Sequence, residues 1–272
     1  MLNENDIKNL CKKIRHTILD MSLGAGASSS HFGGGLSLVE IISVLFSNYL
    51  NLKNNPNDES KNRFILSKGH GVLPYYSALF HKGYIDKSHI QSFEKTGGIL
   101  FGHPVRNPKY GIDYSTGSLG MGIGLAVGIS IAFKRKDMKN KTYCIIGDGE
   151  CNEGSVWEAA MSACHNELDN LTVILDNNSL QQTGSNIEIS NPNILSKKWK
   201  SFGFETIEID GHNIKEIFEA LNYNVRKKPK IIIAKTIKGK GFSFAENNND
   251  WHHKVLTKSA YEDALKELEN YN

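Results

Sequence analysis

The chain has little of what marks secreted, membrane or zinc-binding proteins. Its four cysteines are scattered over 272 residues, with no CxxC pair and no zinc-ligand spacing, so free cytosolic thiols are expected rather than a disulfide framework. No apolar run approaches the roughly 20 residues that span a bilayer. The N-terminus lacks the basic-then-apolar pattern of a secretion signal. We therefore expect a cytoplasmic protein.

The charge balance and the glycine pattern exclude further classes. The net charge is +3, with lysines and acids intermixed, which gives no reason to expect nucleic acid or a membrane surface as partner. No GxxxxGK[ST] motif is present, and Gly120, Gly122 and Gly124 follow a loop rather than a strand, so a generic nucleotide-binding sheet is disfavoured. We find no internal repeat and no linker, and we expect one domain over residues 1–272.

Strand-like and helix-like segments alternate along the chain, which predicts an α/β fold with a mostly parallel sheet flanked by helices. Expected strands are 64–66, 143–146, 171–176, 204–209 and 230–235. Expected helices are 5–22, a segment after Ser37, 73–82, 86–94, 119–134, 154–167, 192–201, 213–226 and 258–270. Residues 24–35, 96–118 and 237–253 are expected to be loops. Ser37 and Glu40 have the spacing of a capping box.

Two polar clusters close consecutive strands. Gly147-Asp148-Gly149 follows one apolar run, and Asn177-Asn178 follows the next. Residues 150–176 between them suffice for one crossover helix, which would bring both clusters to the same edge of a parallel sheet. Ligands of open α/β sheets bind beyond the carboxyl ends of the strands. A carboxylate and an amide oxygen there suit Mg²⁺ bridging to phosphate oxygens.

This pair of clusters resembles the magnesium and diphosphate motif of thiamine-diphosphate enzymes. With the other glycine- and histidine-rich blocks, nearly the whole chain resembles the N-terminal, diphosphate-binding domain of transketolase, from about residue 10 to 256. The blocks, in order, are SSSHFGGGLS (28–37), SKGHG (67–71), FGHP (101–104), STGSLGMG (115–122), GDGECNEG (147–154), LDNNSLQQTG (175–184) and DWHH (250–253). The resemblance implies a thiamine-diphosphate-binding fold and an enzyme of the transketolase type.

The resemblance also assigns roles to named residues. Mg²⁺ would be held by the side chains of Asp148 and Asn178 and the backbone oxygen of Leu180. Thiamine diphosphate would lie against Gly149 and the Gly117-Ser118-Leu119 turn, with its diphosphate on His70 and His252. The implied catalytic residues are His31, His103, His252 and Glu153, with Glu153 as a proton relay between the two cofactor sites of a dimer. Histidine suits proton transfer on sugar hydroxyls near neutral pH.

Some positions carry a second interpretation or depart from the family pattern. His253 neighbours His252 and is the other candidate for the last active-site histidine. Lys238 and Lys240 could reach phosphate, although a solvated, mobile lid is the favoured interpretation. Phe32 stands where the family usually has proline, and Ser118 replaces another proline. Both replacements affect the expected choice of sugar, and they affect the expected binding of the cofactor less.

A full transketolase continues into a pyrimidine-binding domain, for which the sequence offers no candidate segment. We therefore expect the first subunit of a split transketolase, which transfers a two-carbon ketol unit from a ketose donor to an aldose acceptor. It would need a separate C-terminal subunit, with two copies of each chain (α2β2). Alternatives are a subunit of a 2-oxo acid dehydrogenase, a 1-deoxyxylulose-phosphate synthase, or a non-catalytic paralogue. The sequence does not name the donor or acceptor sugar.

Overall fold

The structure, a computed structural model, describes residues 2–50, 58–190 and 194–270. The described chain divides into two compact units. The helical unit comprises the described residues of 1–56, 69–115 and 237–272, and the sheet unit those of 57–68 and 116–236. No helix in the described parts of the chain is long and apolar enough to cross a membrane.

The sheet unit is built on five parallel strands in the order β1-β2-β3-β5-β4. They are β1 (Arg63–Leu66), β2 (Thr142–Gly147), β3 (Leu171–Asn177), β4 (Glu205–Asp210) and β5 (Lys230–Lys235). Every residue of β2 is buried, as apolar strands covered on both faces require. Gly147 pairs with Asp176 in register, so the polar clusters that follow β2 and β3 leave the sheet at one edge.

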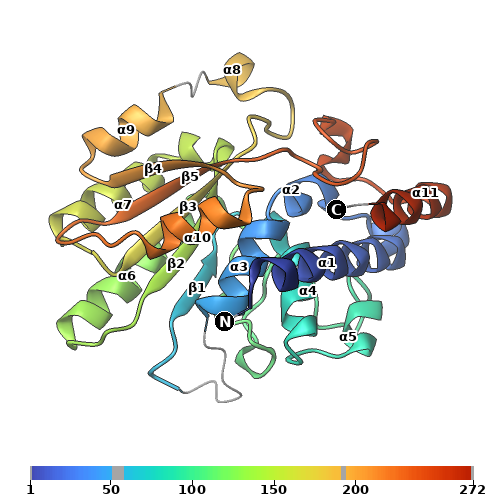
Figure 1. Ribbon diagram of the computed structural model, residues 1–272, viewed down its shortest axis with the longest axis horizontal. Helices are drawn as coiled ribbons and strands as arrows, with labels where there is room; N and C mark the ends of the chain where they lie inside the picture. Colours follow the sequence, from blue (N-terminus) through green and yellow to red (C-terminus); the bar gives the residue numbers. More distant parts are fainter. Residues whose placement is uncertain (1, 51–57, 191–193, 271–272) are drawn as a thin grey trace. The chain divides into compact units, whose positions relative to one another are not determined.

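The helices of the sheet unit lie on both faces of the sheet. They are α6 (Met121–Arg135), α7 (Gly154–His165), α8 (Asn186–Ile189), α9 (Leu195–Ser201) and α10 (Ile214–Asn222). Right-handed crossovers place α6, α7 and α9 on one face, because they connect strands that run in one direction across the sheet. The chain returns from β4 to β5 through α10, which lies on the other face (Figure 1).

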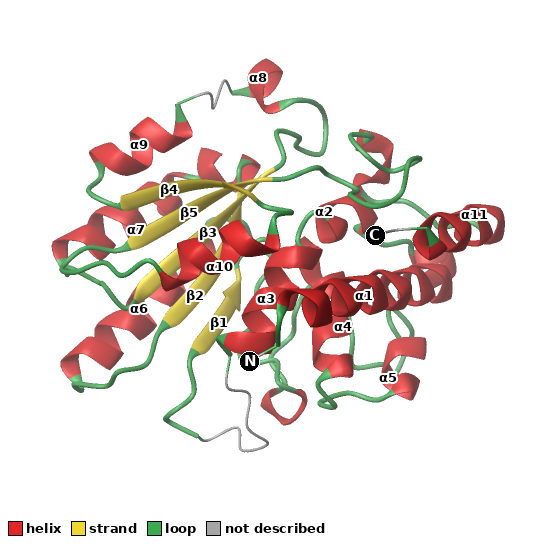
Figure 2. Ribbon diagram, viewed as in Figure 1, coloured by secondary structure: helices red, strands yellow, loops and turns green. Residues whose placement is uncertain are grey.

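The helical unit packs its elements around α1 (Figure 2). Its helices are α1 (Glu4–Ala25), α2 (Phe32–Leu36), α3 (Val39–Asn48), α4 (Val72–His81), α5 (Lys87–Gln91) and α11 (Lys258–Glu269). Short 3₁₀ turns lie at Gly26–Ser28, Gly69–Gly71, Pro108–Tyr110 and Asn249–His252, and another, at Gly149–Asn152, belongs to the sheet unit. Asn3 begins α1 with a capping box to Asp6, and Ile7, Ile14 and Ile18 form its buried face.

The prediction of a parallel sheet flanked by helices is confirmed, and several local predictions are wrong. Ser37 does not cap a helix: its hydroxyl donates to the Gly34 carbonyl oxygen, while Glu40 forms a buried ion pair with Arg15 at 2.7 Å. The predicted loop 24–35 contains most of α2. Predicted helix 86–94 shortens to α5, and 213–226 ends at Asn222.

Two further predictions are neither fully confirmed nor wrong. The first two residues of predicted helix 192–201 lie outside the described residues, and α9 begins at Leu195. The single domain over residues 1–272 stays a prediction.

Candidate active site

Asp148 and Asn178 lie at the carboxyl ends of β2 and β3, and both are buried. Asp148 Oδ1 accepts a hydrogen bond from Gly149 N at 2.7 Å, and Oδ2 accepts one from Ser179 N at 2.6 Å. Asn178 Oδ1 accepts from Leu180 N at 3.1 Å. Backbone donors therefore fix both predicted metal-binding side chains before any ligand is bound.

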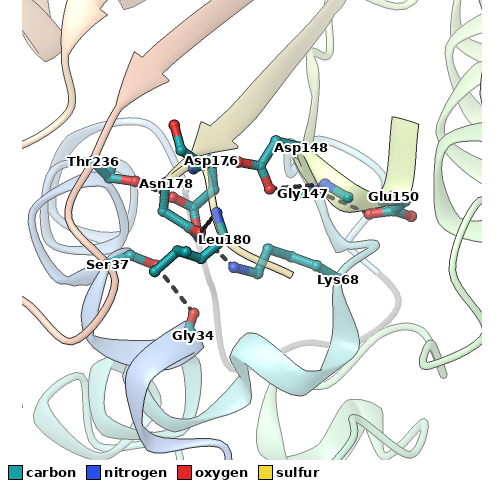
Figure 3. Close-up of polar contacts among 12 residues, drawn as sticks. Gly34, Ser37, Lys68, Gly147, Asp148, Glu150, Asp176, Asn178, Leu180 and Thr236 are labelled. Atoms are coloured by element: carbon teal, nitrogen blue, oxygen red, sulfur yellow. Dashed lines mark hydrogen bonds and ion pairs between the residues drawn. The ribbon is translucent and has the colours of Figure 1, made fainter. Parts of the chain in front are cut away.

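Asp176, the last acidic residue of β3, is the centre of a buried polar network (Figure 3). Lys68 Nζ lies 2.5 Å from Asp176 Oδ2, and Asn178 Nδ2 donates to the same oxygen at 3.3 Å. The Thr236 hydroxyl donates to Asp176 Oδ1. Together with Asp148, these four residues form what we call the carboxylate cluster.

A buried glutamate, Glu150, closes the turn after β2. Its carboxylate accepts hydrogen bonds from the Ser67 hydroxyl, from Gly120 N at 2.8 Å and from Gly147 N at 3.1 Å. Burial raises the pKa of Glu150, and these donors oppose the rise. Glu150 thus ties the end of β1, the start of α6 and the end of β2 together beside the predicted metal ligands.

The electrostatics of the carboxylate cluster fit a cation. Burial, with the neighbouring charge of Asp176, raises the pKa of Asp148 to about 6, although two backbone donors and Lys68 oppose the rise, so a cation beside the ionised form would stabilise it. Among the described residues, no three His, Cys, Asp or Glu side chains are grouped to hold a metal ion. The predicted site uses one such side chain, Asp148, with amide and backbone oxygens, a donor set that suits Mg²⁺.

The predicted cofactor-contacting backbone also belongs to the sheet unit. Gly117, Ser118 and Leu119 form the turn before α6, with Gly117 at a φ of 152°. A Cβ at Gly149 would approach Gln181 Cγ to 3.0 Å, so a larger residue there would require the Gln181 side chain to move. The exposed Glu153 begins α7 and lies against Gly120, where a Cβ would be 2.7 Å from Glu153 Cβ.

The predicted histidines come together in the helical unit. The His31 ring centroid lies 5.6 Å from His70, 5.3 Å from His103 and 5.6 Å from His252. His70 and His252 are also in contact, at 5.4 Å. His253 lies nearest to His31, at 4.4 Å. We call these five residues the histidine cluster; four come from separate loops and turns, and His253 follows His252.

Packing and hydrogen bonds hold the backbone around the histidine cluster. The buried Tyr76 hydroxyl donates to the carbonyl oxygens of Phe101 and His103, at 3.0 and 3.3 Å. Gly33 allows Trp251 to approach, because a Cβ there would be 3.0 Å from the Trp251 carbonyl oxygen. Burial lowers the pKa of His103, which favours the neutral ring, able to accept a proton.

Lys238 corrects one prediction. It is 1% exposed, and its ammonium donates to Asn249 Oδ1 at 2.9 Å, so the expectation of a solvated side chain there is wrong. Lys240 is half-buried and pairs with Glu246 at 3.4 Å. Both lysines hold loops of the helical unit together.

Sequence reasoning missed Lys68, Glu150, Asp176 and Thr236. Two of them carried a usable signal: Asp176 is an acid that ends an apolar strand, and Lys68 follows another strand directly. Such charges are rarely buried unless paired. Their partnership depends on strand order, which brings residues distant in sequence together.

A five-stranded parallel α/β unit with polar strand ends defines the class of fold, and comparisons with known proteins define the family. The family described as "Transketolase, thiamine diphosphate binding domain" matches residues 7–269. A subunit of the apulose-4-phosphate transketolase of Actinobacillus succinogenes is 39% identical over 99% of this chain and 98% of its own length. The chain therefore belongs to the transketolase family and corresponds to its thiamine-diphosphate-binding domain.

Two further relatives differ in length. The 6-deoxy-6-sulfo-D-fructose transketolase subunit SqwG of a Clostridium species is 38% identical, with 97% of this chain and 96% of the relative covered. Human transketolase is 36% identical over 96% of this chain, which spans 42% of the human protein. The crystal structure of Campylobacter jejuni transketolase matches with a TM-score of 0.90 and 29% identity, over 98% of this chain and 43% of that one.

Proposed function

We propose that this chain is the diphosphate-binding subunit of a two-chain, Mg²⁺-dependent transketolase. With a second subunit, it would move a two-carbon ketol unit from a ketose to an aldose. When bound, thiamine diphosphate supplies the electron sink for carbon–carbon cleavage, while the protein supplies binding, orientation and proton transfer. The names of the two subunit relatives, which this chain covers almost completely, support the two-chain organisation.

The observation that carries the proposal is Asp148. It is a buried carboxylate with a raised pKa, fixed by two backbone donors beside Asn178. Such a group is poised to exchange its proton for a cation. We assign Mg²⁺ to Asp148, Asn178 and the Leu180 carbonyl oxygen. The backbone at Gly149 and at the 117–119 turn would contact the cofactor.

The histidine cluster supports sugar chemistry. We assign His70 and His252 to the cofactor diphosphate, with His252 also acting as a catalytic residue. His31 and His103 would exchange protons with substrate hydroxyls, a role that suits a neutral ring such as His103. Ketol transfer needs several such proton movements, whereas decarboxylation of a 2-oxo acid needs fewer.

An exposed apolar face on the sheet unit supports the need for a partner. One side of α6 carries the residues at positions i, i+3, i+4 and i+7, which are Met121, Gly124, Leu125 and Gly128. A Cβ at either glycine would meet nothing within 4 Å. Met121 is 64% exposed, and Met161 on the adjacent α7 is 55% exposed. Exposed apolar side chains gathered on one face of a helix are typical of protein interfaces. We propose an α2β2 assembly in which Glu153, beside this face, relays protons between the two cofactor sites.

Reconstitution tests the proposal. The purified chain, the second chain alone and an equimolar mixture of both are assayed with thiamine diphosphate and Mg²⁺ for ketol transfer to ribose 5-phosphate. Donors are hydroxypyruvate, xylulose 5-phosphate and fructose 6-phosphate, followed by apulose 4-phosphate and 6-deoxy-6-sulfofructose, and pyruvate is tested separately as a 2-oxo acid substrate. We expect transfer only from the mixture. Robust activity of this chain alone would contradict the two-chain organisation, and turnover of pyruvate without ketol transfer would contradict the reaction.

A further inference from the structure

His253 joins the histidine cluster as a fifth ring, and its backbone is held in place. Ser30 and Lys254 form an antiparallel bridge, with hydrogen bonds of 3.3 and 3.1 Å in the two directions. The preceding Trp251 is buried and packs on Phe32 at 5.5 Å and on Phe244 at 4.7 Å. The position of His253 is therefore set on both sides by the fold.

The ring of His253 contacts a hydroxyl as well as a histidine. Both of its ring nitrogens lie 3.1 Å from Ser29 Oγ, so the hydroxyl oxygen rests against the ring between them rather than in line with either nitrogen. The Ser29 hydroxyl also donates to the Ser28 carbonyl oxygen at 2.7 Å. With its proton used there, the Ser29 hydroxyl holds the ring by contact, and it does not occupy the in-plane hydrogen-bonding direction of either ring nitrogen.

The backbone of Ser29 is strained. Its φ of 56° and ψ of −174° fall in a region that is essentially restricted to glycine. A serine there costs conformational free energy, and such outliers concentrate at functional sites. The side chain is buried and directed to His253. A side chain placed here in spite of this strain, and in contact with His253, points to a use for that contact.

The four rings around His31 lie toward two ends of the histidine cluster. His252 contacts both His31 and His70, which places it at the end that we assign to the diphosphate. His253 contacts His31 and Ser29 instead, and its charge also lowers the pKa of His103. It therefore belongs to the end of the cluster that we assign to the substrate. His253 is exposed, while the other four rings are partly buried.

From this geometry we propose that His253 contacts the hydroxyl-bearing chain of the donor sugar, beyond its ketol carbons, and that Ser29 positions the ring for this contact. The assignment rests on the proposed function. An exposed imidazole beside His31 offers its ring nitrogens as hydrogen-bond partners to a sugar hydroxyl entering the site. The pair would then select among ketose donors without taking part in the chemistry common to all of them.

The test compares a donor that has a sugar chain with one that lacks it. Hydroxypyruvate carries the transferred two-carbon unit but no sugar chain, so the proposed contact is missing from its reaction. kcat/KM for the donor is measured with the wild-type two-chain enzyme and with His253→Ala and Ser29→Gly, using hydroxypyruvate and the best ketose phosphate of the donor panel. His16→Ala, at an exposed histidine of the same unit outside the cluster, is the matched control.

We expect His253→Ala to lower kcat/KM for the ketose about tenfold, the size of one or two lost hydrogen bonds. The value for hydroxypyruvate should change by less than about twofold. Ser29→Gly removes the hydroxyl but suits the positive φ, so we expect the same selective loss, about three- to tenfold, with an unchanged or higher Tm. His16→Ala should alter neither donor.

The outcomes separate this inference from the proposed function. Parallel loss with both donors, or no change with either, in an active wild-type enzyme would overturn the role of His253 alone. A selective loss in His253→Ala that is absent in Ser29→Gly would overturn the positioning role of Ser29. If the wild-type pair of subunits transfers no ketol unit from any donor, the proposed function fails and the inference with it.

Discussion

The carboxylate cluster and the histidine cluster hold their polar groups in opposite ways. In the carboxylate cluster, Asp148 and Asp176 are buried and bound by backbone amides, a lysine and a threonine. In the histidine cluster, partly exposed rings lie against one another at 4.4–5.6 Å. The first arrangement fixes charge in place, whereas the second leaves ring nitrogens able to exchange protons.

The difference shows that cation binding and proton exchange require different surroundings. A cation site must hold oxygen ligands in a narrow geometry, and backbone donors at strand ends do this because the sheet is rigid. Proton exchange needs groups that titrate near neutral pH and can be reached by substrate. Substitutions in the two clusters should therefore separate binding, catalysis and stability, from the largest expected effect to the smallest.

The largest effect is expected in the histidine cluster. His103→Asn keeps a polar side chain but removes the titratable ring, so kcat of the two-chain enzyme should fall roughly 100- to 10,000-fold. Binding of thiamine diphosphate, measured by calorimetry, should stay within about twofold. His16→Asn is the control. A matching loss of cofactor affinity would place His103 at the diphosphate instead.

In the carboxylate cluster, Asp148→Asn should abolish binding rather than turnover alone. The amide removes the metal-binding charge, so the affinity for thiamine diphosphate with Mg²⁺ should fall at least about 100-fold. The Tm without ligands should change little, because relief of the buried charge is offset by the loss of one of the two backbone hydrogen bonds that Asp148 accepts. Asp137→Asn, at an exposed acid of the same unit, should change neither quantity. Unchanged affinity in Asp148→Asn would remove the metal assignment.

Lys68→Met tests whether the carboxylate cluster depends on its internal ion pair. Removing one partner of a buried pair leaves Asp176 uncompensated, so we expect urea unfolding to show a loss of about 3–5 kcal/mol. Asp176→Asn added to Lys68→Met should restore part of that loss. At the exposed Lys235–Glu208 pair, Lys235→Met should cost less than about 1 kcal/mol. Equal effects at the two lysines would contradict the account.

Two glycines of α6 allow a packed position to be compared with an open one. A Cβ at Gly122 would lie 2.6 Å from Ser67 Cβ, so Gly122→Ala should destabilise the chain by about 1–3 kcal/mol in urea unfolding. Gly124 faces open space, and Gly124→Ala should stabilise the isolated chain by up to about 1 kcal/mol. If α6 binds the second subunit, Gly124→Ala should also weaken that complex. The reverse order of stabilities would contradict the packing of α6.

The pH dependence follows from Asp148, whose pKa rises from an ordinary 3.8 to about 6 in the folded chain. Because the folded state holds this proton more tightly, the group's contribution to the stability of the ligand-free chain falls as pH rises from about 4 to 6. Mg²⁺ needs the ionised form. In the two-chain enzyme, the rise in Tm caused by Mg²⁺ and thiamine diphosphate should therefore reach its full size about one pH unit above this pKa and fade below it. A rise that is constant from pH 5 to 7.5 would exclude Asp148 as a ligand.

Much of the fold could be predicted from the sequence, because strand and helix periodicity are local. The apolar pattern predicts a strand over residues 230–235, which matches β5, and the crossover between the two polar clusters forms as expected. The short helix α2 escapes prediction because its three consecutive glycines disfavour a helix. It is held by packing: Gly33 admits Trp251, and Phe32 stacks on Phe242 at 5.7 Å.

In the candidate site, too, the residues that belong to local sequence patterns could be predicted, and those paired over long distances could not. Glycine- and histidine-rich blocks point to His31, His70, His103 and His252, and the structure brings all four together. Lys68 and Asp176 lie 108 residues apart, so no local pattern predicts their pairing. The prediction for Lys238 is wrong because a KGKG loop is typical of a solvated segment, whereas this ammonium is buried against Asn249.

The most direct test of the central claim is a calorimetric titration of thiamine diphosphate into this chain, with and without its second subunit, in the presence of Mg²⁺ or of a chelator. We predict tight binding only when both Mg²⁺ and the second subunit are present. Absence of binding under all four conditions would contradict the cofactor site, and tight binding without Mg²⁺ would contradict the role given to Asp148.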